Sequence, residues 1–176
     1  MGLSLNAMGT PVSWQIVPNE SELTFTGTQN GAPVTGSFKQ FTGTILFDPN
    51  DLKNSSIDIV VDINSVITSY AELKDTLLTS DWFNAKNFPK AEFKSTQIDK
   101  LNDKEFEAKG ILTIRDKSQP VVLTFTESEP GPNKAVASGS TSIKRTAFGV
   151  GQGEWAGTDQ VKDDVKINFK VIATKK

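Results

Sequence analysis

The sequence of 176 residues contains no cysteine and no histidine. Without cysteine the chain can form no disulfide, offers no thiolate to a metal ion and has no cysteine nucleophile. Without histidine it lacks the commonest general base and the commonest ligand of zinc and haem. An enzyme can work without both residue types, but their absence makes catalysis much less expected, and we predict a protein that is not an enzyme, has no metal site and requires no cofactor.

An excess of positive charge and a long apolar run are also missing. The chain carries 19 Lys and Arg against 21 Asp and Glu, a net charge of −2, whereas a nucleic-acid partner demands a basic face. No apolar run approaches the roughly 18 residues of a membrane-spanning helix. The longest candidate, residues 57–63, is cut by Asp58 and Asp62. We expect neither a nucleic-acid partner nor stable insertion in a membrane.

The residues that are present favour one domain with a sizeable core. Hydrophobic residues make up 36% of the chain, and most of the 11 phenylalanines stand in alternating segments rather than in clusters. Residues 1–10 have neither the charged start nor the long apolar stretch of a signal peptide. We interpret them as an N-terminal tail or an expression scar, and residues 11–176 as the domain.

One hairpin organises the predicted fold. Residues 106–115 alternate as in a pleated strand, with Phe106 and Ile114 on the same face. Asp116, Lys117 and Ser118 have turn chemistry, and a second strand follows over residues 121–127. A two-stranded hairpin is not stable alone, so the remaining chain must supply its partners.

Alternating patterns recur along the chain. Further strands are predicted at residues 14–18, 21–26, 34–48, 56–64, 91–98, 136–145 and 165–174. The apolar parity changes between Phe38 and Phe41, which predicts a bulge or bend there. About eight strands at regular spacing indicate an all-β fold, either an antiparallel sandwich or a barrel.

One segment follows the helical period instead. Residues 69–81 place Leu73 and Leu77 four residues apart, and Ser69 with Glu72 has the spacing of a capping box. We predict a helix over this range, with Ser69 as its N-cap.

Two motifs with the residue types of an active site are better explained structurally. Asp58 and Asp62 share one face of a strand, about 13 Å apart, farther than the carboxylates of a glycosidase. We interpret them as an outward polar face. Residues 149–153, Gly-Val-Gly-Gln-Gly, are not followed by the helix that a dinucleotide-binding loop requires, so we expect these glycines to permit a bend.

Lys144 and Arg145 stand beside Phe148 at a strand end. They can be a solvated terminus or partners of a carboxylate. A buried arginine at the mouth of an apolar cavity would instead fix a polar head group. The interior of an eight-stranded barrel can be filled by side chains or hold one slim ligand, and the pattern leaves both open.

Six stretches together resemble one known family. They are Trp14-x-Ile-Val-Pro18 with Ser21-x-Leu-x-Phe25, Val34-x-Gly-x-Phe38-x-x-Phe41-x-Gly43, Asp62-Ile-Asn-Ser65, Leu78-Thr-Ser-Asp-Trp-Phe83 with Phe88-Pro-Lys-Ala-Glu-Phe-Lys-Ser95, Gly110-Ile-Leu-Thr-Ile114 with Pro120-Val-Val-Leu, and Ile143-Lys-Arg145-Thr-Ala-Phe-Gly149. In this order, over nearly the whole chain, they resemble the YceI-like family of bacterial periplasmic proteins.

The resemblance implies an eight-stranded antiparallel, lipocalin-like barrel with one short helix between strands. It also implies an apolar tunnel that binds a polyprenyl lipid or an isoprenoid quinone such as ubiquinone, in the periplasm. One departure stands in the helix, where the family pattern Arg-Asp-x-His-Leu reads Lys74-Asp-Thr-Leu77-Leu78 here. The loss of histidine puts a polar role at that position in doubt.

Our leading hypothesis is a secreted, non-catalytic carrier or reservoir of an isoprenoid lipid. The bulky alternating positions, and Arg145 from its place in the family motif, give the predicted ligand-binding residues: Leu23, Phe25, Phe38, Phe93, Ile114, Phe125, Ile143, Arg145, Phe148 and Phe169. The alternatives are a stress-related structural or interaction module with a filled barrel, and a hydrolase or isomerase of hydrophobic substrates. Both a monomer and a homodimer stay open.

Overall fold

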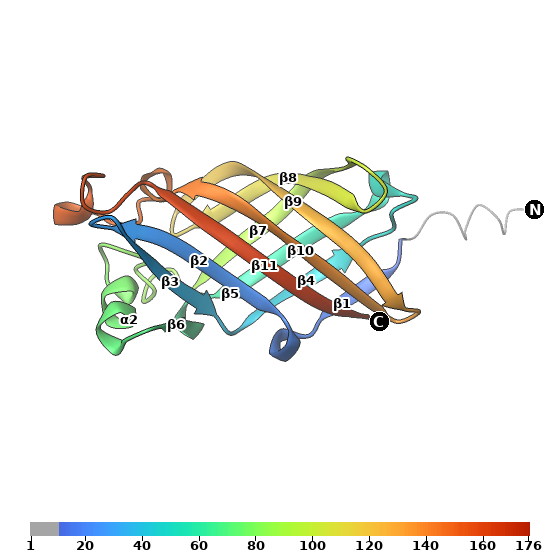
Figure 1. The fold of residues 1–176 in the computed structure, drawn as a ribbon, viewed down its shortest axis with the longest axis horizontal. Helices are drawn as coiled ribbons and strands as arrows, with labels where there is room; N and C mark the ends of the chain where they lie inside the picture. The colour runs from blue at the N-terminus through green and yellow to red at the C-terminus, as the bar shows by residue number, and fades with distance from the viewer. Residues whose placement is uncertain (1–10) are drawn as a thin grey trace, which may run out of the picture.

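Eight long antiparallel strands follow one another around a closed barrel in chain order (Figure 1). The computed structural model describes residues 11–176, so the predicted tail at residues 1–10 lies outside the described residues. The predicted all-β, eight-stranded antiparallel barrel with one short helix is confirmed.

The first three long strands are each broken into two pieces. The pieces are β1 (Ser13–Ile16) and β2 (Glu22–Gln29), β3 (Ala32–Phe38) and β4 (Phe41–Leu46), β5 (Ser56–Asp62) and β6 (Val66–Thr68). The other five are β7 (Lys90–Lys100), β8 (Glu105–Ile114), β9 (Lys117–Gly131), β10 (Lys134–Lys144) and β11 (Asp164–Lys175).

The last strand closes the barrel. One edge of β11 pairs with β10 along its whole length. The other edge pairs with both pieces of the first strand, with Phe169 opposite Leu23 on β2 and Thr174 opposite Gln15 on β1. The break between these pieces is a short 3-10 helix, Pro18–Glu20, at the predicted joint. Closure leaves β11 without an unpaired edge that could recruit another chain.

The predicted bend between Phe38 and Phe41 is confirmed. Strand β3 ends at Phe38 and β4 begins at Phe41. Phe38 before the break and Phe41 after it both face the barrel interior, although one position number is even and the other odd. Since side chains alternate along a strand, the break contains one residue more than the alternation requires, and this keeps apolar side chains inside on both pieces.

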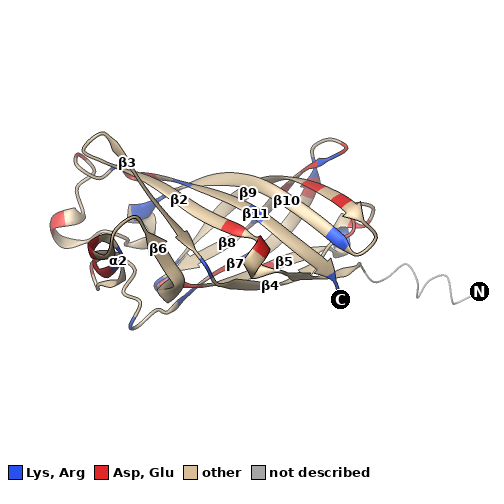
Figure 2. Ribbon diagram, turned by 60° about the horizontal axis from the view of Figure 1, so that its bottom comes forward, with Lys and Arg blue, Asp and Glu red and all other residues tan. Residues whose placement is uncertain are grey.

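Asp58 and Asp62 lie on the outer face of β5, as their spacing predicted, and charged residues are spread over the strands and loops of the barrel (Figure 2). Asp58 and Asp62 alternate with Ile57, Ile59 and Val61, which face the interior, so both carboxylates lie on the outer side. Two apolar residues on the outer face of β8 and β9 are exposed, Ile111 by 39% and Val122 by 42%.

Helix α2 (Ala71–Leu78) is shorter than predicted. Its two leucines pack as the spacing predicted, with Leu77 buried and Leu73 against the same core. The predicted capping box is wrong, because the N-cap residue is Tyr70 and no side chain caps the helix. Tyr70 itself has an extended backbone (φ −152°, ψ 151°), so the helix begins at Ala71 and its N-cap lies one residue after the predicted one.

The predicted turn of the organising hairpin is displaced by one residue. Strand β8 ends at Ile114 and pairs there with Lys117, so the turn consists of Arg115 and Asp116 alone. Arg115 adopts a left-handed conformation (φ 58°). Lys117 and Ser118, whose composition suggested a turn, belong to β9.

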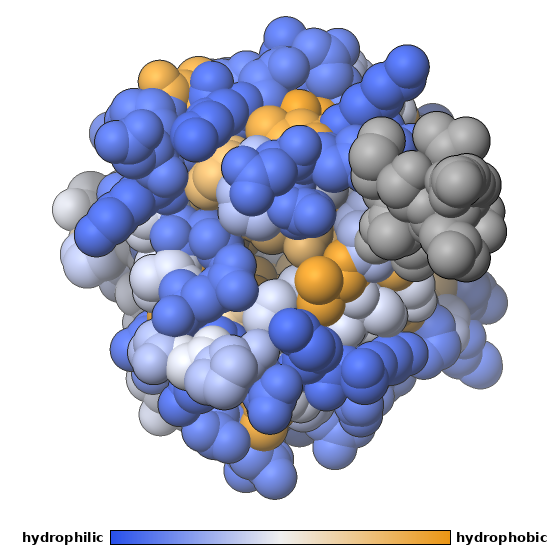
Figure 3. All heavy atoms as spheres, turned by 90° about the vertical axis from the view of Figure 1, so that its right-hand side faces the viewer, coloured by the Kyte–Doolittle hydropathy of each residue, from blue (hydrophilic) through white to orange (hydrophobic). Residues whose placement is uncertain are grey.

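The two ends of the barrel differ. Helix α2 and the 3-10 helices η4 (Arg145–Phe148) and η5 (Gly153–Trp155) gather at one end, which we term the helix end (Figure 1). The C-terminus and β1 lie at the opposite end. Viewed onto this opposite end, hydrophilic side chains form most of the rim, and hydrophobic ones show between them (Figure 3).

Candidate functional site

An apolar cavity of about 480 Å³ lies inside the barrel. It runs between two clusters of buried side chains, one at each end, and half-buried Leu112 and Val121 pack against both clusters. Its volume falls within the range of about 300 to 1,000 Å³ that small-molecule sites occupy. The barrel is therefore hollow.

The cavity is long and narrow. The inward-facing residues of β11 that line it are Val165, Ile167, Phe169, Val171 and Ala173. These eight residue steps cover about 26 Å of strand, or about 20 Å along the barrel axis at a tilt near 40°. This shape suits an extended chain better than a compact ligand.

All ten residues predicted to bind ligand line this cavity. Phe93, Ile114, Phe125, Arg145 and Phe148 are buried, whereas Leu23, Phe25, Phe38, Ile143 and Phe169 are half-buried. The structure thus places them on one continuous inner surface. Their contact with a ligand stays a prediction.

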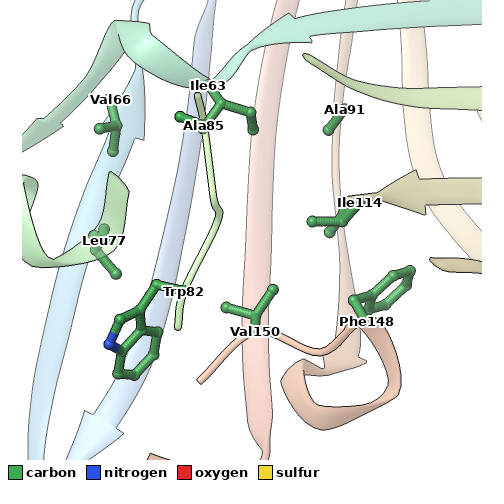
Figure 4. Packing of buried hydrophobic residues seen from close by; sticks show 9 residues of the cluster. All are labelled: Ile63, Val66, Leu77, Trp82, Ala85, Ala91, Ile114, Phe148 and Val150. Atoms are coloured by element: carbon green, nitrogen blue, oxygen red, sulfur yellow. The ribbon is translucent and has the colours of Figure 1, made fainter. Parts of the chain in front are cut away.

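Aromatic rings crowd the helix end of the cavity. Trp82 follows α2 and stacks against Trp155 of η5, with ring centres 5.7 Å apart. The guanidinium carbon of Arg145 lies 5.7 Å from the centre of the Trp82 ring, within reach of a cation–π contact. Leu77 and Val150 flank the indole (Figure 4). Together these side chains close much of the interior at this end.

Arg145 is buried, with 3% exposure, and holds the loop at this end together. Its five N–H groups have five acceptors, all backbone carbonyl oxygens: Lys162 (3.1 Å), Val150 (3.0 Å), Gly151 (3.3 Å), Gly157 (2.9 Å) and Val161 (2.8 Å). An arginine side chain has no further donor. The loop carbonyls already take the hydrogen bonds that the prediction assigned to a ligand head group.

Burial lowers the pKa of Arg145, and the nearby Asp163 carboxylate acts in the opposite direction. Lys144, next to it in sequence, faces solvent instead and forms an ion pair with Asp164. The two neighbouring cations thus have different roles: Lys144 is the partner of a carboxylate, and Arg145 is a buried support of the loop.

The glycines after Phe148 make room for this arrangement. Gly149, Gly151 and Gly153 all have positive φ, and a Cβ on Gly151 would lie 2.1 Å from the Arg145 Nη1 atom. The loop can approach the guanidinium only because Gly151 has no side chain. The glycines serve the bend that the sequence indicated.

A second arginine, which the sequence did not single out, supports the same end. The Nη1 atom of Arg115 donates to the carbonyl oxygens of Ser80 (2.6 Å) and Trp82 (2.7 Å). These bonds tie the segment after α2 to the turn between β8 and β9, and so fix the backbone that carries Trp82.

Aromatic residues form the floor of the cavity at the opposite end. Phe106 stacks on Phe125 at 5.7 Å, Phe47 meets Phe106 edge-on at 5.2 Å, and the Trp14 Nε1 atom donates to the Phe47 carbonyl oxygen at 3.2 Å. Three small inward-facing residues, Ala135, Ala137 and Ala173, line the same end. Their size leaves the space that the rings do not fill.

Glu127 brings a carboxyl group to this end. It continues the inward-facing series of Val121, Leu123 and Phe125 on β9, and it lines the cavity. Its Oε2 atom is buried without an N–H or O–H partner. Burial first, and then a hydrogen bond and charge repulsion from Glu129, raise its pKa from 4.5 to about 7. The shared parity of residues 121 to 127 was the signal that could have revealed it.

The described residues 11–176 contain no cluster of three or more acidic residues positioned to hold a metal ion. In the same part of the chain, no helix is both long and apolar enough to cross a membrane. The site is thus an apolar cavity with a few polar groups near its two ends.

Comparison with known sequences and structures yields consistent matches. The profile of the YceI-like domain matches residues 14–173. A UPF0312 protein of Vibrio cholerae is 28% identical over 122 residues, 66% of this chain and 65% of its own length. Protein YceI of Salmonella arizonae is 35% identical over 88 residues, 50% of this chain and 46% of its own length. The matches thus span about half to two thirds of these relatives.

Two solved structures share the barrel. BcnA of Burkholderia cenocepacia superimposes with a TM-score of 0.86 at 32% identity, over 90% of this chain and 99% of its own. A polyisoprenoid-binding domain from Saccharophagus degradans gives a TM-score of 0.73 at 14% identity, over 94% and 99% of the two chains. The latter likeness is one of fold.

Substituting Gly151 by alanine should destabilise the barrel. The new Cβ collides with the Arg145 guanidinium, and the left-handed backbone (φ 89°) disfavours any side chain, so we expect a loss of at least about 1 to 2 kcal/mol. Gly157→Ala is the matched control, because a Cβ there meets nothing within 4 Å. Urea unfolding of both variants measures the difference, and equal stabilities would contradict the role given to Gly151.

The substitution Glu127→Gln should change how stability depends on pH. The folded state holds the Glu127 proton more tightly than the unfolded state, so the native protein loses stability as pH rises from about 4.5 to about 7. The variant has no such proton, and its advantage in free energy of unfolding should grow over this window and then stay constant. Chemical unfolding from pH 4 to 9 tests this, with Glu92→Gln on the outer face as control. A constant difference would refute the assignment.

Proposed function

The chain belongs to the YceI-like domain family, and we propose that its cavity binds an isoprenoid lipid, a polyprenyl chain or an isoprenoid quinone. We further propose that the protein carries or stores this lipid without catalysing a reaction, and that it does so in the bacterial periplasm. The polyisoprenoid-binding domain that shares the fold supports this choice of ligand.

One observation carries the proposal: the cavity is continuous and apolar along the barrel. Its walls come from the inward positions of all eight long strands, and most of these side chains are Val, Leu, Ile or Phe. The cavity therefore selects for an extended hydrocarbon. It also argues against the alternative of a barrel packed solid.

The free energy available is sufficient for such a ligand. Each buried CH₂ group contributes about 0.8 kcal/mol, so ten of them give about 8 kcal/mol. That is the binding free energy of a micromolar complex, before the cost of ordering a flexible chain. Because this contribution grows with every buried unit, the tail supplies most of the affinity.

A direct test is to extract the purified protein with organic solvent and to identify the extract by mass spectrometry. A native mass spectrum of the same sample gives the stoichiometry and separates a monomer from a homodimer. We expect one prenyl lipid per barrel. If the extract is empty, the purified protein is titrated with decylubiquinone and with squalene. The proposal is rejected if neither lipid binds.

A charge placed inside the cavity should abolish lipid binding. Phe38 lines the cavity and packs on Phe25 and Phe83, with ring centres 5.6 and 5.9 Å away. In Phe38→Glu an unpaired carboxylate would face the hydrocarbon, at a cost of several kcal/mol. We expect lipid affinity to fall at least about a hundredfold.

The matched control is Ile111→Glu, which places the same charge on the outer face, where residue 111 is 39% exposed. It should bind lipid like the native protein. Circular dichroism establishes that both variants are folded. Equal lipid retention by two folded variants would contradict the placement of Phe38 at the ligand.

A further inference from the structure

Two side chains that line the cavity have buried polar atoms without a hydrogen-bond partner. Among residues 11–176, these are the Nε1 atom of Trp82 at the helix end and the Oε2 atom of Glu127 at the opposite end. A buried polar atom without a partner destabilises the folded state, and native proteins contain few of them. Each needs an explanation, and the two differ in chemistry.

The Glu127 carboxyl has Glu129 beside it, and a proton shared by the two groups can satisfy its oxygen. Trp82 has no such neighbour. An indole nitrogen is a donor only, so it can be satisfied only by an acceptor. The contrast with Trp14 is direct, because the Trp14 Nε1 atom has the Phe47 carbonyl oxygen at 3.2 Å.

The packing of Trp82 holds its ring in place. The residue is 8% exposed, Trp155 lies 5.7 Å from its ring centre, and Arg115 bonds to its backbone carbonyl. Figure 4 shows the indole between Leu77 and Val150, with its nitrogen on the edge turned away from Val150. The side chain that carries this N–H group is therefore a fixed part of the cavity wall.

The electrostatic surroundings favour an oxygen atom. The Arg145 guanidinium lies 5.7 Å from the Trp82 ring centre, and its N–H groups bond to neutral carbonyl groups rather than to a carboxylate. The nearby Asp163 carboxylate offsets part of its positive charge, and the remainder acts on the helix end of the cavity, where the low dielectric strengthens its field. A partially negative acceptor is the complementary group.

We propose that the indole N–H of Trp82 donates a hydrogen bond to an acceptor oxygen of the lipid head group, such as a quinone carbonyl. The head group then lies at the helix end, and the tail extends toward Phe125 and the three inward-facing alanines. This inference rests on the proposed function and adds to it the chemistry and the orientation of the head group. Arg145 contributes charge, while Trp82 contributes the hydrogen bond.

The indole N–H resonances of the ¹⁵N-labelled protein test the proposal. The chain has three tryptophans, hence three such signals, and Trp82→Phe identifies one of them. Adding decylubiquinone should move the Trp82 signal downfield, whereas squalene, a prenyl hydrocarbon without oxygen, should not. The Trp14 signal, already hydrogen-bonded, is the internal control. Equal shifts of the Trp82 signal with both lipids would overturn the proposal.

Affinities provide an independent test. Trp82→Phe keeps an aromatic ring and removes the donor, so decylubiquinone binding should weaken about two- to tenfold relative to squalene. Trp155→Phe is the matched control, since it removes an indole N–H from the half-buried partner of the same stack, and it should leave this ratio unchanged. An equal loss for both lipids in Trp82→Phe would show a packing role only and refute the proposed bond.

The two proposals fail in different ways. If neither lipid binds the native protein, lipid binding itself is wrong. If both bind and Trp82→Phe leaves the ratio of their affinities unchanged, only the role of Trp82 is refuted.

Discussion

Closure of the barrel by backbone hydrogen bonds between the last strand and the first is the constraint on which the remaining structure depends. Strand β11 must pair with β10 on one edge and with both β1 and β2 on the other. Once the ring is closed, every second side chain faces inward, whatever its size. The inward residues do not fill the enclosed volume, and a cavity of about 480 Å³ results. The cavity thus follows from closure combined with the sizes of particular inward side chains.

The ends of a hollow barrel need packing of their own, because the strand pattern no longer determines the structure there. The opposite end uses packed rings, with Phe47, Phe106 and Phe125 in mutual contact. The helix end uses a buried cation, because Arg145 gathers five backbone carbonyls of a loop that contains no regular strand. Buried backbone carbonyls need donors, and one arginine supplies them. This arrangement requires glycine at position 151, since any side chain there would occupy the position of the Arg145 guanidinium.

The sequence predicted what depends on period and parity. The eight strands, the break after Phe38 and the inward positions of the eight cavity residues that lie on strands follow from a two-residue alternation that tertiary contacts do not override. The other two, Arg145 and Phe148, lie in the 3-10 helix η4, and Arg145 was predicted from the family motif. The prediction from the sequence was wrong where the backbone conformation of a single residue determines the position of a turn or of a helix start. The left-handed Arg115 moved the hairpin turn, and the extended Tyr70 delayed the helix. The sequence could predict neither the hydrogen bonds that Arg145 donates nor the missing partner of the Trp82 nitrogen, because hydrogen-bond partners distant in sequence leave no periodic signal.

A cavity of this kind links ligand binding to stability. Side chains around an unfilled apolar volume lack dispersion partners on one side, and an unpaired N–H at Trp82 adds a further cost. A lipid that fills the volume and accepts this hydrogen bond removes both costs in the folded state only. Mass action then raises the free energy of unfolding with lipid concentration. Under the proposed function, the features that leave the empty barrel incompletely packed, three alanines at one end and an unpaired donor at the other, are therefore the features by which the protein retains a prenyl lipid.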